Sequence, residues 1–309
     1  MNLQHKQKIT ESVIEWIDFS EERSANKLSQ QSGVVSAYIS RIRNGEYSMS
    51  TGEGKNSPIP DKVFNTLSDF LGLRFDTELH WDTKNYLLVQ TVCQSAQSKR
   101  QRILLEADTG LGKTYSLERY ALHNDKVLYI KVTRTMSAKD MLEEICKKLL
   151  IKDQLRGNRS KMLAIQRKVT SVNGYLIIID EAEYLKNNLF DLVKEIADFT
   201  DRKCGMILSG MNLISKINTM ADRAKPGFPQ LRRRFFPNRV ELKEISKEEI
   251  KEICKTSGIT DTTAINVLAK YIFDYDMLSQ YVQVILENIR NCGEQLNGKD
   301  IIDLFNLDY

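Results

Sequence analysis

The sequence Ile103-Leu104-Leu105-Glu106-Ala107-Asp108-Thr109-Gly110-Leu111-Gly112-Lys113-Thr114 decides the fold. It begins as an apolar, strand-like run, breaks at two glycines and continues as a helical pattern over residues 114–123. Glycine lets backbone N–H groups turn inward because no Cβ stands in the way. A helix that begins near Lys113 also directs its positive end at the same point. The stretch therefore predicts a strand, a phosphate-binding loop and a helix.

The residue types of this loop suit a triphosphate. The ammonium group of Lys113 is expected to reach the β and γ oxygens, and the hydroxyl of Thr114 to bind Mg²⁺. The strict pattern has glycine where this chain has Ala107, and a positive φ there would cost about 1–2 kcal/mol, which a packed loop tolerates. We predict that ATP is bound by the loop residues Asp108, Thr109, Gly110, Leu111, Gly112, Lys113, Thr114 and Tyr115.

A pair of acidic residues follows a second apolar run. Residues 176–179 are continuously apolar, as expected for a strand buried on both faces, and Asp180 and Glu181 come next. Asp180 would help Thr114 to hold Mg²⁺, and Glu181 would orient and deprotonate the attacking water. An acidic helix start after a strand is a common alternative for this pair alone. Together with the phosphate loop, the pair favours a nucleotide hydrolase.

Composition favours an intracellular protein. The 309 residues exceed one average domain, and 41% hydrophobic content can form a sizeable core. No apolar run approaches the length of a membrane span, and the N-terminus lacks a signal-peptide pattern. We therefore expect a cytoplasmic location without a membrane partner. The five cysteines are widely separated and form no C-x-x-C pair, so they are expected to be reduced structural thiols.

The N-terminal part, residues 1–76, is predicted to be a small all-α domain. Helical patterns occur at 9–19, 24–33 and 35–43, and Gly33 provides a tight turn of the helix-turn-helix kind. Residues 48–60 contain glycines and prolines and are predicted to be a loop before a helix at 61–71. The domain boundary is expected between Leu73 and Trp81.

Residues 36–45, Ser-Ala-Tyr-Ile-Ser-Arg-Ile-Arg-Asn-Gly, resemble the phage-repressor type of DNA-binding domain. In that family the second helix of the motif enters the major groove. The resemblance implies that Ser36, Ala37, Ser40 and Arg41 face DNA and that Arg43 lies nearer the backbone. A helical protein-interaction domain on the same frame is the alternative. Charge does not separate the two, since residues 1–49 hold six basic and six acidic side chains.

Residues 77–244 alternate between strand and helix patterns. Strands are predicted at 103–105, 127–132, 175–179, 205–209 and 239–242. Helices are predicted between them at 114–123, 138–150, 161–172, 189–199 and 211–220. Repeated βα units indicate an α/β fold with a parallel sheet flanked by helices. From residue 245 to 309 the patterns are helical, which predicts a small helical lid.

A parallel sheet with both nucleotide motifs and a helical lid resembles the AAA+ ATPase family. That family places a polar sensor residue at the tip of the strand over residues 207–212, where we favour Asn212 and keep Ser209 as the alternative. It also has an arginine finger before a phenylalanine, here Arg234, with Arg232 and Arg233 as rivals. The family's lid arginine is expected near residues 276–279, where this chain has none, and this departure implies slow turnover.

A repressor-like region followed by such a module resembles the phage Mu B transposition proteins and their transposon relatives. The resemblance implies an ATPase that forms homo-oligomers or helical filaments on double-stranded DNA, largely without sequence preference, and activates a transposase. Nucleotide would lie between subunits. A nucleotide-switched transcription regulator and an ATP-driven loader or remodeller of a protein partner remain alternatives.

Basic residues mark candidate DNA contacts outside the N-terminal region. The net charge is only +4, but residues 213–243 hold eight basic and two acidic side chains. Such a segment suits a polyanion, although a solvated charged face is an ordinary alternative. The candidates here are Arg223 and Lys225, and after the second strand they are Lys131, Arg134 and Lys139.

Overall fold

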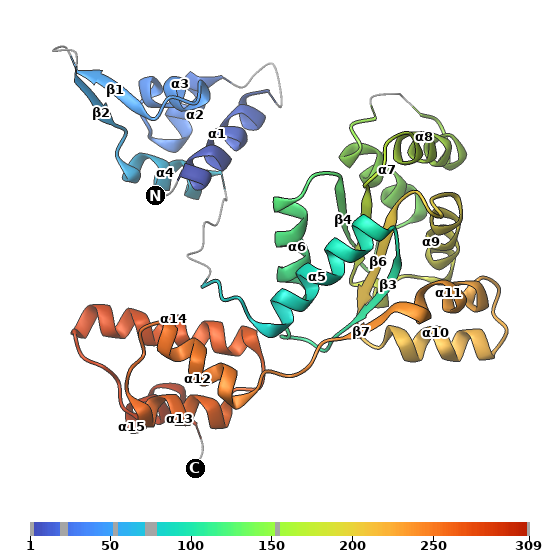
Figure 1. Cartoon of the computed structure of the whole chain (residues 1–309). Coiled ribbons are helices and arrows are strands. Elements are labelled where there is room, and N and C mark those ends of the chain that lie inside the picture. Colours follow the sequence, from blue (N-terminus) through green and yellow to red (C-terminus); the bar gives the residue numbers. More distant parts are fainter. Residues whose placement is uncertain (1–2, 19–23, 52–54, 72–78, 152–154, 308–309) are drawn as a thin grey trace. The chain divides into compact units, whose positions relative to one another are not determined.

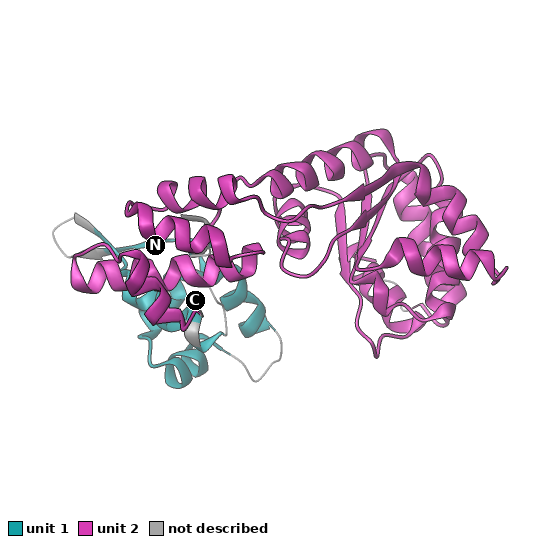
Figure 2. Ribbon diagram, turned by 90° about the horizontal axis from the view of Figure 1, so that it is seen from below, with its two compact units in different colours: residues 1–78 teal, residues 79–309 magenta. Residues whose placement is uncertain are grey.

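The computed structural model describes residues 3–18, 24–51, 55–71, 79–151 and 155–307. The chain divides into two compact units, Met1–Glu78 and Leu79–Tyr309, which Figure 2 shows in teal and magenta. Most of the predicted boundary region, residues 72–78, lies outside the described ranges.

Four helices build the core of unit 1. They are α1 (Leu3–Asp18), α2 (Ala25–Ser32), α3 (Ser36–Arg43) and α4 (Asp61–Phe70). Ser24 caps the start of α2, because its side chain accepts a hydrogen bond from the Lys27 N–H. Gly33 ends α2 with a φ of 74°, a conformation that glycine adopts without steric cost. The predicted tight turn between α2 and α3 is therefore present.

A short hairpin separates α3 from α4. Strands β1 (Ser48–Thr51) and β2 (Lys55–Pro58) pair antiparallel, with Ser48 opposite Pro58. The prediction of a loop over residues 48–60 was wrong, and unit 1 is helical with one hairpin and not all-α. Strands of four residues are too short for an alternating pattern to be recognised, and backbone pairing needs no particular side chains.

Unit 2 contains a parallel sheet of five strands, as predicted. The strands are β3 (Arg102–Glu106), β4 (Val127–Lys131), β5 (Leu176–Asp180), β6 (Gly205–Gly210) and β7 (Arg239–Glu241). Their order in the sheet is β4-β5-β6-β3-β7. The sequence neighbours β3 and β4 are separated by β5 and β6, so the loop after β3 lies beside the end of β6 and near that of β5.

Helices cover both faces of this sheet (Figure 1). One face packs against α5 (Lys84–Lys99) and α6 (Lys113–His123) through alternate strand residues such as Ile178 and Ile207. The other face carries the larger core around Ile177 and Leu208. Its helices are α7 (Ala138–Lys148), α8 (Asn158–Ser171), α9 (Asn187–Phe199), α10 (Leu213–Asp222) and α11 (Phe228–Phe235). Two short 3₁₀ turns, η1 (Ala182–Tyr184) and η2 (Phe236–Asn238), follow β5 and α11.

The C-terminal helices form the lid, defined here as residues 247–305. They are α12 (Lys247–Thr256), α13 (Thr262–Tyr271), α14 (Tyr275–Cys292) and α15 (Gly298–Phe305). Each begins at a polar residue whose side chain caps it: Ser246, Asp261, Asp274 and Asn297. The lid has its own apolar cluster. Across the described ranges, no helix combines the length and apolar character needed to cross a membrane.

We predict that Gly205→Ala destabilises unit 2. A Cβ at this position of β6 would lie 2.7 Å from the carbonyl carbon of Ala96 in α5, and backbone atoms cannot move aside cheaply. We expect a loss of about 1–3 kcal/mol in chemical denaturation of the full chain. Ser215→Ala, at an exposed position of α10, is the control and should stay within about 0.5 kcal/mol. Equal stability of both variants would contradict the close packing of β6 on α5.

Candidate functional site

The loop between β3 and α6 has the backbone conformation of an anion cradle. Gly110 and Gly112 have φ values of 75° and 76°, and Gly112 is the residue from which α6 starts. The unpaired N–H groups at the start of α6 therefore point toward this loop. Ala107 is buried and is not among the described residues with positive φ, so the missing glycine of the motif causes no strain.

Asp180 lies fully buried at the end of β5, beside this loop. Its Oδ2 accepts hydrogen bonds from the Thr114 hydroxyl at 2.8 Å and the Tyr129 hydroxyl at 3.0 Å. Burial, together with the charge of Asp180, raises the pKa of Tyr129, so the phenol remains a protonated donor. The other oxygen, Oδ1, has no hydrogen-bond partner within the described structure. A buried carboxylate oxygen without a donor is costly, and a bound cation would satisfy it.

Thr114 and Asp180 therefore fit the predicted Mg²⁺ site. The described residues hold no group of three His, Cys, Asp or Glu side chains that could bind an ion without a ligand's help. Mg²⁺ commonly takes only one or two carboxylates and completes its shell with water and substrate phosphates. A hydroxyl and one carboxylate at a phosphate loop match that donor set.

Glu181 is held in place by Lys131. The Nζ of Lys131, at the end of β4, lies 3.1 Å from Oε1 of Glu181, and this contact raises the pKa of Lys131. Glu181 itself has a φ of 54°, which costs a non-glycine residue about 1–2 kcal/mol. The predicted general base and a predicted DNA contact thus form one ion pair, which sequence reasoning did not anticipate.

Ser209 lies beside Asp180. The register pairs Ile179 of β5 with Leu208 of β6, so the next residues along the two strands, Asp180 and Ser209, are neighbours. Strand alternation directs Ser209 to the same face as Ile207, which is covered by α5 and α6. Ser209 is buried, and its hydroxyl has no partner in the part of the chain that the structure describes. Asn212, favoured from the sequence, is exposed beyond the strand. The geometry favours Ser209 as the sensor, and the role of Asn212 stays a prediction.

The three candidate finger arginines lie on α11 and differ in their partners. Arg234 forms an ion pair with Asp198, and Arg232 forms one with Asp222 at 2.6 Å. Arg233 is exposed and has no ion pair among the residues described. The finger assigned from the sequence, Arg234, is thus engaged within its own subunit, whereas Arg233 is available to another one.

Three rings gather next to the loop. His80 Nδ1 lies 2.9 Å from the hydroxyl of Tyr115, and the His80 and Tyr86 ring centroids are 4.7 Å apart. Tyr115, predicted to bind the cofactor, directly follows Thr114. Burial lowers the pKa of His80, which favours the neutral imidazole. Sequence reasoning missed His80 and Tyr86, because single aromatic residues on a linker and a helix carry no motif.

The other predicted loop residues surround this centre. Asp108 and Thr109 are exposed, and Leu111 is buried. The side chain of Asn85 in α5 donates hydrogen bonds to the carbonyls of Leu111 and Lys243, at 3.3 and 2.8 Å. Asn85 was not predicted, and it joins the phosphate loop to the segment that leads into the lid.

The candidate DNA-binding residues differ in their exposure and in whether they already have partners within the chain. On α3, Ser40 is exposed and Ser36 is half-buried, whereas both arginines have partners. Arg43 forms an ion pair with Asp18 at 3.7 Å, and Arg41 donates to Glu46 and to the Ser48 carbonyl. Between β4 and α7, all three candidates have local contacts: Lys131 with Glu181, Arg134 with the ring of Tyr184, and Lys139 with Glu143. After α10, Arg223 and Lys225 are exposed.

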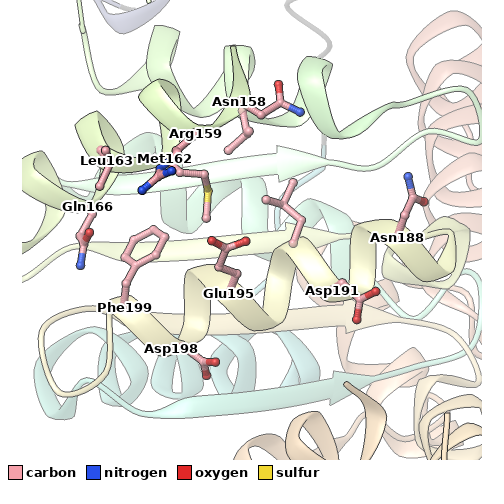
Figure 3. Close-up of a pocket in the computed structure, with 12 residues that line it drawn as sticks. Asn158, Arg159, Met162, Leu163, Gln166, Asn188, Asp191, Glu195, Asp198 and Phe199 are labelled. Atoms are coloured by element: carbon pink, nitrogen blue, oxygen red, sulfur yellow. The ribbon is translucent and has the colours of Figure 1, made fainter. Parts of the chain in front are cut away.

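A pocket of about 820 Å³ lies elsewhere in unit 2. It is lined mainly by α8 and α9, and Figure 3 shows Glu195 of α9 beside Met162 of α8, while Asp191 and Asp198 point away from Met162. None of the phosphate-loop residues lines it. Its volume would suit a ligand, but the chemistry described above is not there.

Residues 96–217 match the model of the AAA domain family. This part of the chain is therefore similar to AAA domains. The match spans the phosphate loop, the acidic pair and Ser209, and the sheet with its flanking helices has the P-loop AAA+ α/β fold. Among curated proteins, no sequence matches the chain significantly.

Solved structures support the same fold. Cdc6p from Pyrobaculum aerophilum is similar with a TM-score of 0.56 and 14% identity, over 72% of this chain and 66% of that one. Orc1 from Aeropyrum pernix, solved in complex with DNA, has a TM-score of 0.51 and 14% identity, over 71% and 63%. A Walker-type ATPase from Pyrococcus abyssi has a TM-score of 0.51 and 16% identity, over 73% of this chain and 72% of that one. The chain thus spans less than two thirds of the length of the first two proteins.

We predict that Asp180→Asn removes the Mg²⁺-dependent part of nucleotide binding. The substitution takes away the charge of the unpartnered oxygen while it keeps the size of the side chain. The measurement is ATP affinity with Mg²⁺ and with excess chelator. Tyr129→Phe, which removes only a hydrogen bond to Asp180, should reduce the Mg²⁺ effect by about tenfold without abolishing it. An unchanged Mg²⁺ effect in Asp180→Asn would contradict the assignment.

Proposed function

We propose that this chain is an ATP-dependent, largely sequence-independent DNA-binding ATPase that assembles on target DNA and directs a transposase. The observation that carries the proposal is the 2.8 Å hydrogen bond between Thr114 and Asp180, beside the buried oxygen that lacks a partner within the described residues. Together with the left-handed glycines of the loop, it supports binding of ATP with Mg²⁺. The AAA domain match agrees with this chemistry.

Each residue of the site has a role in ATP hydrolysis. The loop N–H groups and Lys113 hold the phosphates, and Mg²⁺ bound by Thr114 and Asp180 would neutralise charge that develops on them. Glu181 takes the proton from the attacking water, and Ser209 orients the phosphate or the water. The ion pair with Lys131 restrains the Glu181 carboxylate, so hydrolysis without a partner is expected to be slow.

DNA binding would act on that restraint. Lys131, Arg134 and Lys139 lie on one exposed segment after β4, where phosphate groups could draw Lys131 away from Glu181. Contacts of this kind do not depend on the DNA sequence, and the binding affinity that they provide falls steeply as the salt concentration rises. In unit 1, Nη1 of Arg41 donates to Glu46 and to the Ser48 carbonyl, which restrains this side chain at the surface of α3. The phosphate contacts proposed for unit 2 support binding without sequence preference.

Assembly would bring a second subunit to the nucleotide. Arg233 is exposed and free of ion pairs in the described structure, which supports a role in trans on the phosphates held by a neighbour. Nucleotide would then lie between subunits, and its state would control oligomerisation. The proposal of a transposase as partner rests on the resemblance of the repressor-like region and the AAA-like region to transposition ATPases.

We predict that Glu181→Gln retains ATP and DNA binding and loses hydrolysis, whereas Lys113→Ala loses ATP binding and ATP-dependent assembly. The measurements are ATP turnover and fluorescence anisotropy with random-sequence duplexes under ATP, ADP or no nucleotide, with negative-stain images of the same samples. Filaments or oligomers on arbitrary DNA that require ATP would support the proposal. Binding to one sequence irrespective of nucleotide would favour a transcription regulator instead.

We predict that Arg233→Ala lowers ATP turnover of the assembled protein by about 10³-fold while nucleotide affinity of the dilute protein stays unchanged. A finger acts only on the nucleotide of its neighbour, so the loss requires assembly. Arg234→Ala is the matched comparison on the same helix, and it should lower stability because Asp198 loses its partner. The opposite pattern, with turnover lost only in Arg234→Ala, would return the finger to the residue assigned from the sequence.

A further inference from the structure

The lid contacts the phosphate loop through the start of α14. The Tyr275 N–H at the start of α14 donates to the Gly110 carbonyl at 2.8 Å. The preceding residue, Asp274, lies against Gly110, since a Cβ built on this glycine would be 2.6 Å from Asp274 Cγ and 2.8 Å from its Oδ1. At Gly112 the nearest lid atom would be 3.8 Å away, on the ring of Tyr275. The carboxylate of Asp274 is thus the lid group that faces the loop most closely at these two glycines.

A buried hydrogen-bond network fixes that position. The Tyr275 hydroxyl donates to Oε1 of Glu249 in α12 at 3.0 Å, and the backbone N–H of Lys84 donates to the same oxygen at 2.8 Å. Glu249 and Tyr275 are both buried. Tyr275 is therefore tied to α12 by its side chain and to the loop by its backbone, and Asp274 cannot swing away while this network is intact.

The charge of Asp274 is not offset by a cation among the described residues. The described residues form no ion pair with Asp274 or with Asp276, two residues further along α14. Asp274 accepts a hydrogen bond from the Met277 N–H at 2.7 Å, which caps the helix but leaves the charge in place. Partial burial, and then the charge of Asp274, raises the pKa of Asp276. The first turn of α14 thus presents negative charge to a loop built for anions.

We propose that Asp274 sets the affinity of the phosphate loop and its choice between ATP and ADP, by repelling bound phosphate. This inference rests on the proposed nucleotide site and goes beyond it. In a partly buried site, charges a few ångströms apart interact far more strongly than in water. ATP carries more negative charge than ADP, so Asp274 lowers the affinity for ATP more than the affinity for ADP. Tight ATP binding then requires α14 to leave Gly110, which links nucleotide state to lid position.

Helix capping alone is the competing explanation for Asp274. Aspartate and asparagine are equally good caps, so Asp274→Asn removes the charge and keeps the hydrogen bond to the Met277 N–H. The lid offers a matched control in Asp261, which caps α13 through the Ala264 N–H at 2.8 Å and forms no hydrogen bond or ion pair with the loop in the described structure. A purely structural role predicts the same result for both variants.

The experiment compares the full chain with Asp274→Asn, Asp261→Asn and Lys113→Ala in titrations with ATP and ADP in the presence of Mg²⁺. We expect Asp274→Asn to bind ATP about tenfold and ADP about threefold more tightly, with an unchanged unfolding midpoint in the absence of nucleotide. Asp261→Asn should bind both nucleotides as the unsubstituted chain does. Higher ionic strength should reduce the difference in ATP affinity between Asp274→Asn and the unsubstituted chain.

The outcomes separate this inference from the proposed function. ATP binding that Lys113→Ala abolishes, with equal affinities in Asp274→Asn and the unsubstituted chain, would overturn the role of Asp274 and leave the nucleotide site standing. An equal increase in the affinities of Asp274→Asn for ATP and for ADP would contradict charge repulsion as the cause of the increase. Absence of nucleotide binding in both the unsubstituted chain and Asp274→Asn would contradict the inference and the proposed ATPase together.

Discussion

A buried carboxylate constrains the edge of the sheet on which the candidate site lies. Asp180 is fully buried, and a charge in that position is tolerated only with donors around it. The hydroxyls of Thr114 and Tyr129 supply two of them, so α6, β4 and β5 are held together around one oxygen. The second oxygen is left for a ligand. The need to satisfy Asp180 thus links the start of α6 to the end of β5 and makes the loop between β3 and α6 part of the same site.

The lid depends on the same loop from the other side. Gly110 has a left-handed backbone and no Cβ, and the first turn of α14 occupies the space that a side chain would fill. The side-chain amide of Asn85 donates to a backbone carbonyl of the loop and to one in the segment before the lid, and Glu249 joins Tyr275 to the start of α5. The loop and the lid are therefore joined by polar contacts from Asn85, Glu249 and Tyr275.

Sequence periodicity predicted most of unit 2, because its strands and helices are long enough for their patterns to be recognised. Helix α11 was missed although Phe228, Leu231 and Phe235 are buried at helical spacing, since three arginines and a proline obscure that pattern. The hairpin β1–β2 was missed because its strands are short. In the site, Asn212 was favoured over Ser209 as the sensor residue. Strand alternation from Ile207 would have placed Ser209 on the face of the sheet that α5 and α6 cover, beside the phosphate loop.

The sequence by itself determined the phosphate loop, the acidic pair and the parallel sheet, because each depends on residues adjacent in the chain and on local backbone preferences. The tertiary structure decided which distant side chains meet. It pairs Glu181 with Lys131, engages Arg234 with Asp198, and brings Asp274 against Gly110. Such contacts join residues that are far apart along the chain, and only strand order and helix packing determine their proximity.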